Sequence, residues 1–181
     1  PEEITKLFAS DYYEVRVGAV SIMDFRARDK KTSPEIKKEL YTIYIKNHSR
    51  INNWDLVDRS APHVVGGYLF DKDRKPLYKL AKSKNVWERR TAITATWFFI
   101  RQNDIDDTFT LAELLVHDKA ETVNKAVGSW LREAGKRDKE RLLAFLDRYA
   151  PTMPRITLRY ATETLTLNER KRYLELSNSS N

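Results

Sequence analysis

Apolar residues recur at positions i, i+3, i+4 and i+7 through most of the chain, and the alternation typical of strands is almost absent. This spacing indicates amphipathic helices that each bury one face. The pattern predicts ten or eleven helices, over residues 2–9, 12–29, 33–47, 52–69, 74–82, 86–102, 107–117, 120–135, 138–149, 154–164 and 167–176. The joints between them are short and polar, which indicates antiparallel neighbours packed in pairs. The predicted fold class is therefore all-α.

Three of the predicted helix starts carry residues that suit a first helical turn. Ser33 is followed by Pro34, an N-cap with proline at the first helical position. The segments 52–55 (Asn-Asn-Trp-Asp) and 166–169 (Thr-Leu-Asn-Glu) resemble caps with early acidic residues. Proline and glycine inside residues 61–67 (Ala-Pro-His-Val-Val-Gly-Gly) predict a kink and a close approach of another element. In that segment, His63 is interpreted as a structural histidine with satisfied hydrogen bonds.

A weak internal repeat organises the helices. The segment Tyr13–Val20 lines up with Trp87–Thr94 at an offset of 74 residues, Trp54 lies between them, and a fainter copy begins at Thr122. Spacings of 33 to 41 residues with two helices per unit are typical of a helical solenoid of the HEAT or armadillo type. Such a superhelix curves, so one helix of each pair is expected to line a common concave surface. We expect residues 1–181 to form a single domain of this kind.

Charge adds a possible partner. The chain has 181 residues, with Lys+Arg 33 against Asp+Glu 26, a net charge of +7 and a pI near 9.5. Basic residues gather around residues 26–31, 74–84, 132–141 and 170–172. They fit a phosphate-binding track along the solenoid, and they equally fit an ordinary solvated helix surface, because many are mixed with acids. Charge does not decide between these two interpretations.

Composition removes several classes of chemistry. Cysteine is absent, which excludes disulfides, thiolate metal sites and cysteine nucleophiles, and with only three histidines the sequence does not indicate a histidine-rich zinc site. The glycine-rich phosphate loop, the dinucleotide-binding turn, the zinc protease motif and the serine esterase elbow are all missing. No stretch approaches the ~18 apolar residues of a spanning helix. The chain begins at Pro1 with no signal-like apolar run, so export is not expected.

The strongest candidate for chemistry is a carboxylate beside an aromatic ring. Trp54 and Asp58 are four residues apart and project from one helix face. An anion flanked by aromatic groups can stabilise positive charge that develops on a sugar and can orient a water molecule. Alternatively, Asp58 pairs with a repeat arginine as a structural ladder. Arg90 fits either interpretation, as a bidentate phosphate clamp or as the partner that holds Asp58.

Two other tryptophans lie in helical segments. Trp97 falls in a run that is apolar on nearly every side, which predicts a core position. Trp130 follows Gly128 and Ser129, and a glycine inside a helix marks either close packing or the wall of an open pocket.

Several segments resemble the HEAT-repeat DNA alkylation-repair glycosylases, the AlkD-like proteins. The matching stretches are Ile51–Asp58, Val86–Ile93, Lys125–Gly128 with Leu131–Glu133, and Met153–Arg155 with Leu158–Tyr160. The resemblance implies hydrolysis of the N-glycosidic bond of N3- and N7-alkylated purines in double-stranded DNA, with no metal and no cofactor. It also implies a monomer in the cytoplasm, associated with a bacterial nucleoid.

The resemblance assigns roles to individual residues. Asp58 matches the catalytic carboxylate, Trp54 matches an aromatic that contacts the sugar of the damaged nucleotide, and Arg90 matches a basic residue that holds the DNA backbone near the lesion. Further DNA contacts are expected from Arg89, Arg155, Arg159, Ser129 and Trp130.

The sequence departs from the family pattern in two places, at the second pocket tryptophan and at the N-terminal end. The family commonly places its second pocket tryptophan where this chain has Ser129, so Trp130 is displaced by one position and turned by ~100° about the helix. We expect Ser129 to face the pocket and Trp130 to pack between helices. Family members also have helices ahead of residue 7 that this chain is expected to lack.

The residues leave two rival functions open. One is a non-catalytic module that binds damaged or branched DNA on the same basic face. The other is a scaffold for protein interactions, which is a common role of helical solenoids.

Overall fold

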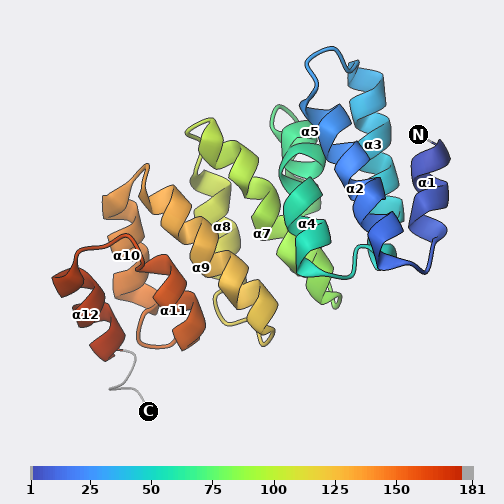
Figure 1. Ribbon diagram of the computed structural model, residues 1–181. Helices are drawn as coiled ribbons and strands as arrows, with labels where there is room; N and C mark the ends of the chain where they lie inside the picture. The colour runs from blue at the N-terminus through green and yellow to red at the C-terminus, as the bar shows by residue number, and fades with distance from the viewer. Residues whose placement is uncertain (1, 177–181) are drawn as a thin grey trace.

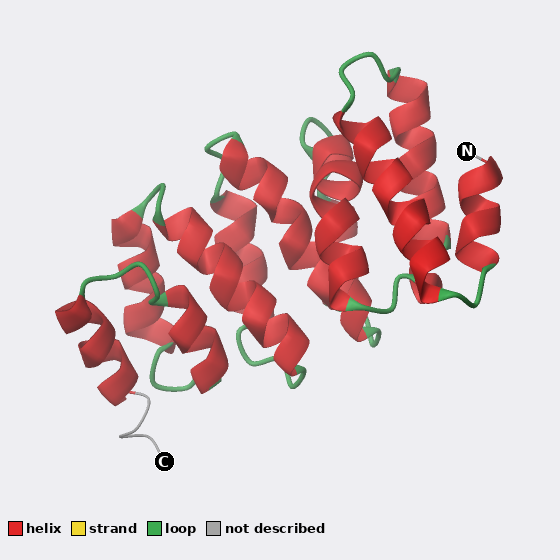
Figure 2. Ribbon diagram, in the orientation of Figure 1, coloured by secondary structure: helices red, strands yellow, loops and turns green. Residues whose placement is uncertain are grey.

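The computed structural model describes residues 2–176, which fold into helices joined by short loops, with no strand among them (Figures 1 and 2). The elements are α1 Glu2–Ala9, α2 Tyr13–Arg28, α3 Pro34–Lys46, the 3-10 turn η1 His48–Arg50, α4 Trp54–Ser60, the π-helical turn η2 Ala61–Gly66, α5 Gly67–Leu69, α6 Lys75–Ala81, α7 Val86–Arg101, α8 Asp106–Leu115, α9 Glu121–Gly135, α10 Lys139–Tyr149, α11 Arg155–Ala161 and α12 Leu167–Leu176. The all-α prediction is confirmed. Helix ends agree with the predicted ends to within two residues, except at the end of α11.

Helix ends follow the local signals. The Ser33 hydroxyl accepts a hydrogen bond from the Ile36 N–H at 3.4 Å, as an N-cap does. Thr166 and Glu169 form a reciprocal capping box, in which each side chain accepts from the backbone N–H of the other, at 3.0 and 3.4 Å. This cap requires a turn before α12, so α11 ends at Ala161 and not at residue 164.

The predicted helix 52–69 is continuous but not uniform. It begins as α4, widens into the π-helical η2 and closes as α5. Pro62 lacks the N–H that an α-helix needs at that place, and a π turn accommodates the loss. A Cβ on Gly66 would collide with the carbonyl oxygen of Ala95 in α7, so the predicted close approach is confirmed.

The helices pack in two rows that together form a solenoid (Figure 1). In the first row, α2 packs on α4, η2 on α7, α7 on α9, and α9 on α11. The second row consists of α3, α6, α8, α10 and α12, and α1 packs against α2 at the N-terminal end. The first row carries most of the residues that the sequence predicts for the site.

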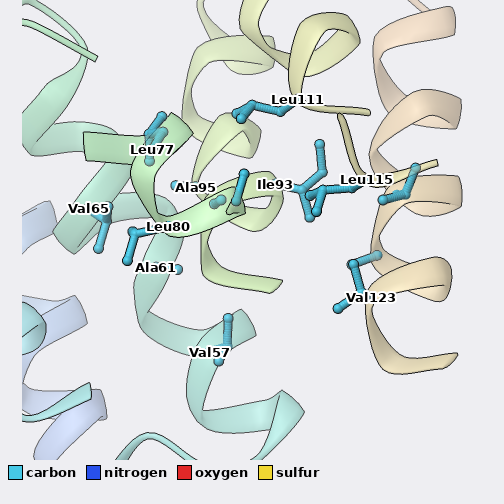
Figure 3. Close-up of a cluster of buried hydrophobic side chains, with 14 of the residues drawn as sticks. Val57, Ala61, Val65, Leu77, Leu80, Ile93, Ala95, Leu111, Leu115 and Val123 are labelled. Carbon is cyan, nitrogen blue, oxygen red and sulfur yellow. The ribbon is translucent and has the colours of Figure 1, made fainter. Parts of the chain in front are cut away.

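The core lies between the two rows (Figure 3). Its labelled side chains include Val57 from α4, Leu77 from α6, Ile93 from α7, Leu111 from α8 and Val123 from α9, all with an exposed fraction of 0%. Burial of each such side chain contributes roughly 1.5–3 kcal/mol. This packing fixes the relative positions of the first-row helices that form the site.

The structure corrects the repeat alignment by one residue. Helices α2 and α7 are both 16 residues long and begin at Tyr13 and Val86, an offset of 73 residues instead of 74. The guanidinium groups of Arg16 and Arg89 donate to carbonyls five and six residues earlier in the chain, at 2.9 to 3.1 Å. The acceptors are Ser10 and Asp11 for the first, and Ser83 and Lys84 for the second. Arg16 is therefore the counterpart of Arg89, and Arg90 has no arginine counterpart in α2.

Candidate active site

Two neighbouring helices bring Asp58 and Arg90 together. The side chain of Asn53 accepts from the N–H of Trp54 at 2.7 Å and starts α4, so Asp58 is the fifth residue of that helix. The side chain of Asn85 accepts from the N–H of Trp87 and starts α7, so Arg90 is also a fifth residue. Because α4 and α7 pack against each other, side chains at the same helical position can meet.

The ion pair between them is bidentate. Arg90 Nε donates to Asp58 Oδ1 at 3.0 Å, and Arg90 Nη2 donates to Asp58 Oδ2 at 2.7 Å. Arg90 Nη1 donates to the carbonyl oxygen of Thr122 and to its hydroxyl, the latter at 3.1 Å. Arg90 thus ties α4, α7 and the start of α9 into one rigid unit.

The solvent exposure of the two side chains indicates different roles for Arg90 and Asp58. The side chain of Arg90 is 9% exposed, whereas that of Asp58 is 31% exposed. All three nitrogens of the guanidinium are used within the protein, so Arg90 is not placed to clamp DNA phosphate, contrary to that prediction. The geometry makes Arg90 the partner that holds Asp58, which was the other interpretation.

A cluster of buried polar side chains packs around Thr91, the residue of α7 that follows Arg90. The Thr91 hydroxyl lies 3.0 Å from the Tyr44 hydroxyl and 2.9 Å from His48 Nε2. Burial raises the pKa of Tyr44 and lowers the pKa of His48, so both groups are favoured in their neutral forms. These uncharged, hydrogen-bonded side chains therefore hold α7 in place next to Arg90.

The carboxylate of Asp58 opens onto a pocket of about 400 Å³, here called the site pocket. Its lining residues are Asp58, Arg90, Trp97, Ala126, Ser129, Trp130, Arg132 and Glu133. A volume of this size suits a small planar ligand or one exposed nucleotide better than a large cofactor.

Two stacked indole rings form one wall of the site pocket. The rings of Trp97 and Trp130 are 5.5 Å apart between centroids and inclined by 26°, and the Trp130 indole N–H donates to the Thr94 hydroxyl at 3.2 Å. Trp97 is therefore a partly exposed wall residue, and its predicted place in the core is wrong. The signal in the sequence was its spacing of seven residues from Arg90, two turns along the same face.

The departure at positions 129 and 130 has a mixed outcome. Ser129 lines the pocket as expected, and Trp130 packs on Trp97 of the neighbouring helix α7 as expected, but Trp130 lines the pocket as well. Gly128 is explained by packing, because a Cβ there would lie 2.6 Å from the carbonyl oxygen of Thr157 and from Cβ of Tyr160. Residues 129 and 130 thus share the wall while Gly128 lets α11 approach α9.

Two charged residues that line the site pocket, Arg132 and Glu133, were not among the predicted site residues. Arg132 Nε donates to Glu133 at 3.1 Å, and Arg132 also pairs with Glu163. Burial alone would raise the pKa of Glu133, but hydrogen bonds from Lys136 and Arg132 outweigh it and place the pKa below its usual value. These residues lie three and four positions after Ser129, so helical spacing was the available signal.

Comparison with known families now places the chain. A family described as DNA alkylation repair enzyme matches residues 1–165 of the 181 residues. The chain belongs to this family. Among curated proteins, none matches the chain.

Family membership gives the chain a role in the repair of alkylated DNA, with DNA as its partner. The resemblance stated from the sequence is confirmed at this level. Within residues 2–176, no helix combines the length and the apolar character needed to cross a membrane.

The remaining predicted DNA contacts fall into two groups. Trp54 is 57% exposed and lies one turn before Asp58 on α4. Arg155 and Arg159 are exposed on α11, where Arg155 also donates to the carbonyl oxygen of Leu174 at 3.2 Å. In contrast, Arg89 binds Asp118 through Nε at 2.6 Å and Nη2 at 3.1 Å.

The side chain of Arg89 is only 17% exposed. Together with its bonds to the carbonyls before α7, this gives Arg89 a structural position. The expectation that Arg89 contacts DNA is therefore not supported by its geometry.

Proposed function

We propose that the chain is a monofunctional DNA glycosylase that hydrolyses the N-glycosidic bond of N3- and N7-alkylated purines in double-stranded DNA, of the 3-methyladenine and 7-methylguanine type. It acts as a monomer, without metal or cofactor, on DNA bound along the concave face of the first row. One observation carries the proposal: a buried arginine holds the partly exposed Asp58 carboxylate at the mouth of an aromatic pocket.

The proposed reaction requires the site mainly to stabilise positive charge on the sugar. An alkylated purine already carries a positive charge, so the bond from C1′ to nitrogen can break with its electrons moving onto the base, which leaves neutral. Positive charge then develops on the sugar, and a fixed anion such as Asp58 stabilises it. Water adds its oxygen to C1′ and gives up a proton, which leaves an abasic sugar.

Arg90 contributes by positioning rather than by touching DNA. Its two hydrogen bonds fix the plane of the Asp58 carboxylate before substrate arrives, so little reorganisation is needed during the reaction. The carboxylate retains its exposed edge toward the pocket.

The aromatic wall accounts for a preference for alkylated bases. Cationic groups are attracted to indole faces by about 0.5–2 kcal/mol, whereas a neutral purine lacks this attraction. The stack of Trp97 and Trp130 and the exposed indole of Trp54 supply such faces near the carboxylate.

The decisive experiment is base release from methylated duplex DNA, with 3-methyladenine and 7-methylguanine separated by chromatography. The proposal predicts release that continues over many turnovers in the presence of a chelator. DNA binding without release would identify the non-catalytic module. Affinity for DNA that fails to fall steeply with added salt would favour the protein scaffold.

A further inference from the structure

A second pocket lies on an adjacent side of α7 from the site pocket. It has a volume of about 290 Å³ and is lined by Ala27, Arg28, Lys37, His63, Val64, Gly67, Tyr68 and Phe98. These residues come from α2, α3, η2, α5 and α7. The π-helical turn η2 forms one wall, and such turns are frequent at functional sites.

A buried carboxylate organises the polar part of this second pocket. Asp24 Oδ1 lies 2.9 Å from His63 Nδ1, and Asp24 Oδ2 lies 3.4 Å from a guanidinium nitrogen of Arg28. The side chain of Asp24 is 11% exposed, so its charge lies behind the two groups that it holds. The imidazole is also fixed edge-on against Phe98, with ring centroids 5.9 Å apart.

The opening of the pocket is positively charged. Lys37 is partly buried, and its ammonium group forms no ion pair or hydrogen bond with the residues 2–176 that the structure describes. Arg28 is 58% exposed and shares Asp24 with His63. Arg28 and Lys37 together outweigh the one carboxylate, while the hydroxyl of Tyr68 adds no charge. The net positive charge at the opening favours an anion over a cation or a neutral molecule as the ligand of the second pocket.

The distance to the site pocket indicates which anion. Trp97 lines the site pocket and its neighbour Phe98 lines the second pocket, so the two pockets open on adjacent sides of one helix. A helix with its side chains is about 10–12 Å wide. The two pockets therefore lie within about one helix width of each other, a span of at most about three base pairs along the axis of a DNA duplex at 3.4 Å each.

We infer that the second pocket binds a backbone phosphate of the DNA, within about three nucleotides of the base held in the site pocket, through Lys37, Arg28 and His63. The inference rests on the proposed function only for the position of the duplex. It adds a contact that fixes the register of the strand relative to Asp58.

The test measures the affinity of the full chain for an undamaged fluorescent duplex by anisotropy, between about 50 and about 200 mM salt. Each lost phosphate contact lowers the slope of log affinity against log salt by about 0.9. Because Lys37 and Arg28 share one phosphate, we expect each single variant to make the slope measurably shallower, and the double variant Lys37→Ala/Arg28→Ala to make it shallower by about 0.9 in total. Thermal melts confirm that the variants are folded.

Arg148→Ala is the matched control. Arg148 is 69% exposed and has one carboxylate partner at 3.4 Å, as Arg28 has, but it lies on α10 and lines neither the site pocket nor the second pocket. Its removal takes away the same charge and should leave the slope unchanged.

Slopes for Lys37→Ala and Arg28→Ala equal to that of the parent chain would overturn the inference. If inorganic phosphate stabilises the parent but not Lys37→Ala, and the DNA slopes are equal, the pocket binds free phosphate and the assignment to DNA is wrong. If the slopes fall while the parent releases no base from methylated DNA, the phosphate site stands and the glycosylase proposal fails.

Discussion

Replacing Asp58 with asparagine separates chemistry from stability at the proposed active site. The substitution keeps the shape of the side chain and removes the negative charge that faces the pocket. Loss of one preorganised electrostatic group of this kind costs about 10²–10³ in rate, or about 2.7–4 kcal/mol. We therefore expect Asp58→Asn to lower base release from methylated duplex DNA by that factor while DNA affinity is retained.

The loss of folding stability in Asp58→Asn follows from the hydrogen bonds between Asp58 and Arg90. Asparagine offers one acceptor to the guanidinium of Arg90, and its amide group faces the other N–H, so one charge-assisted hydrogen bond of about 1.5–3 kcal/mol is lost. Asp58 is 31% exposed, and water compensates part of this loss, which leaves about 1–2 kcal/mol. For a chain of this length, that lowers Tm by about 2–8 °C.

Asp118→Asn provides the control for Asp58→Asn. Asp118 forms an equivalent bidentate pair with Arg89, is 6% exposed and is not among the lining residues of the site pocket. It should lower Tm at least as much and leave base release unchanged at a temperature where the chain is folded. Unchanged release by Asp58→Asn would remove Asp58 from the mechanism, and an equal loss in both variants would attribute the effect to stability.

Three further perturbations test the fold and the pocket. Gly66→Ala forces a methyl group against the carbonyl oxygen of Ala95 and should cost about 1–3 kcal/mol in chemical denaturation, whereas Gly18→Ala meets no atom within 4 Å and should gain up to about 1 kcal/mol; equal effects would refute the close approach. Hydrogen bonds from a lysine and a threonine lower the pKa of Glu169 to about 2 from its usual 4.5, so its contribution is complete above pH 4.5 and is lost as the pH falls through 2. The difference in denaturation midpoint between the parent and Glu169→Gln should accordingly shrink over that range, and a constant difference would contradict the assignment. Trp130→Ala should cost about 1–3 kcal/mol, less than a full core truncation, and slow base release; normal release would exclude the indole from the pocket's function.

Local signals predicted the helices well because each depends on neighbours within a turn or two. The caps at Ser33 and Thr166 and the irregularity at Pro62 were all visible in the sequence, and the structure confirms them. The pocket was harder to predict, because it forms between α7 and α9. Trp97 lies in a run that is apolar on nearly every side, and only its place in the wall of the site pocket shows that one of its faces is open.

The tandem arginines explain both the error in repeat alignment and the location of the site. Arg89 and Arg90 point ~100° apart around α7, so they cannot serve the same partner. Arg89 keeps the role that Arg16 has in α2, binding the carbonyls that precede its helix. Sequence similarity alone could not tell which arginine is the counterpart of Arg16.

The fifth residue of each first-row helix shows where the repeat departs from its own pattern. These residues are Val17, Asp58, Arg90, Lys125 and Arg159, on α2, α4, α7, α9 and α11. In α2 the position is apolar, whereas in α4 and α7 it holds the two partners of the ion pair. In α9 it is Lys125, which pairs with Glu121, and in α11 it is the exposed Arg159. Because equal positions on neighbouring first-row helices share one face, the exposed side chain of Arg159 is expected on the face that carries Asp58. The proposed catalytic carboxylate, the arginine that holds it and the proposed DNA contact at Arg159 therefore arise from one helical position, varied from repeat to repeat.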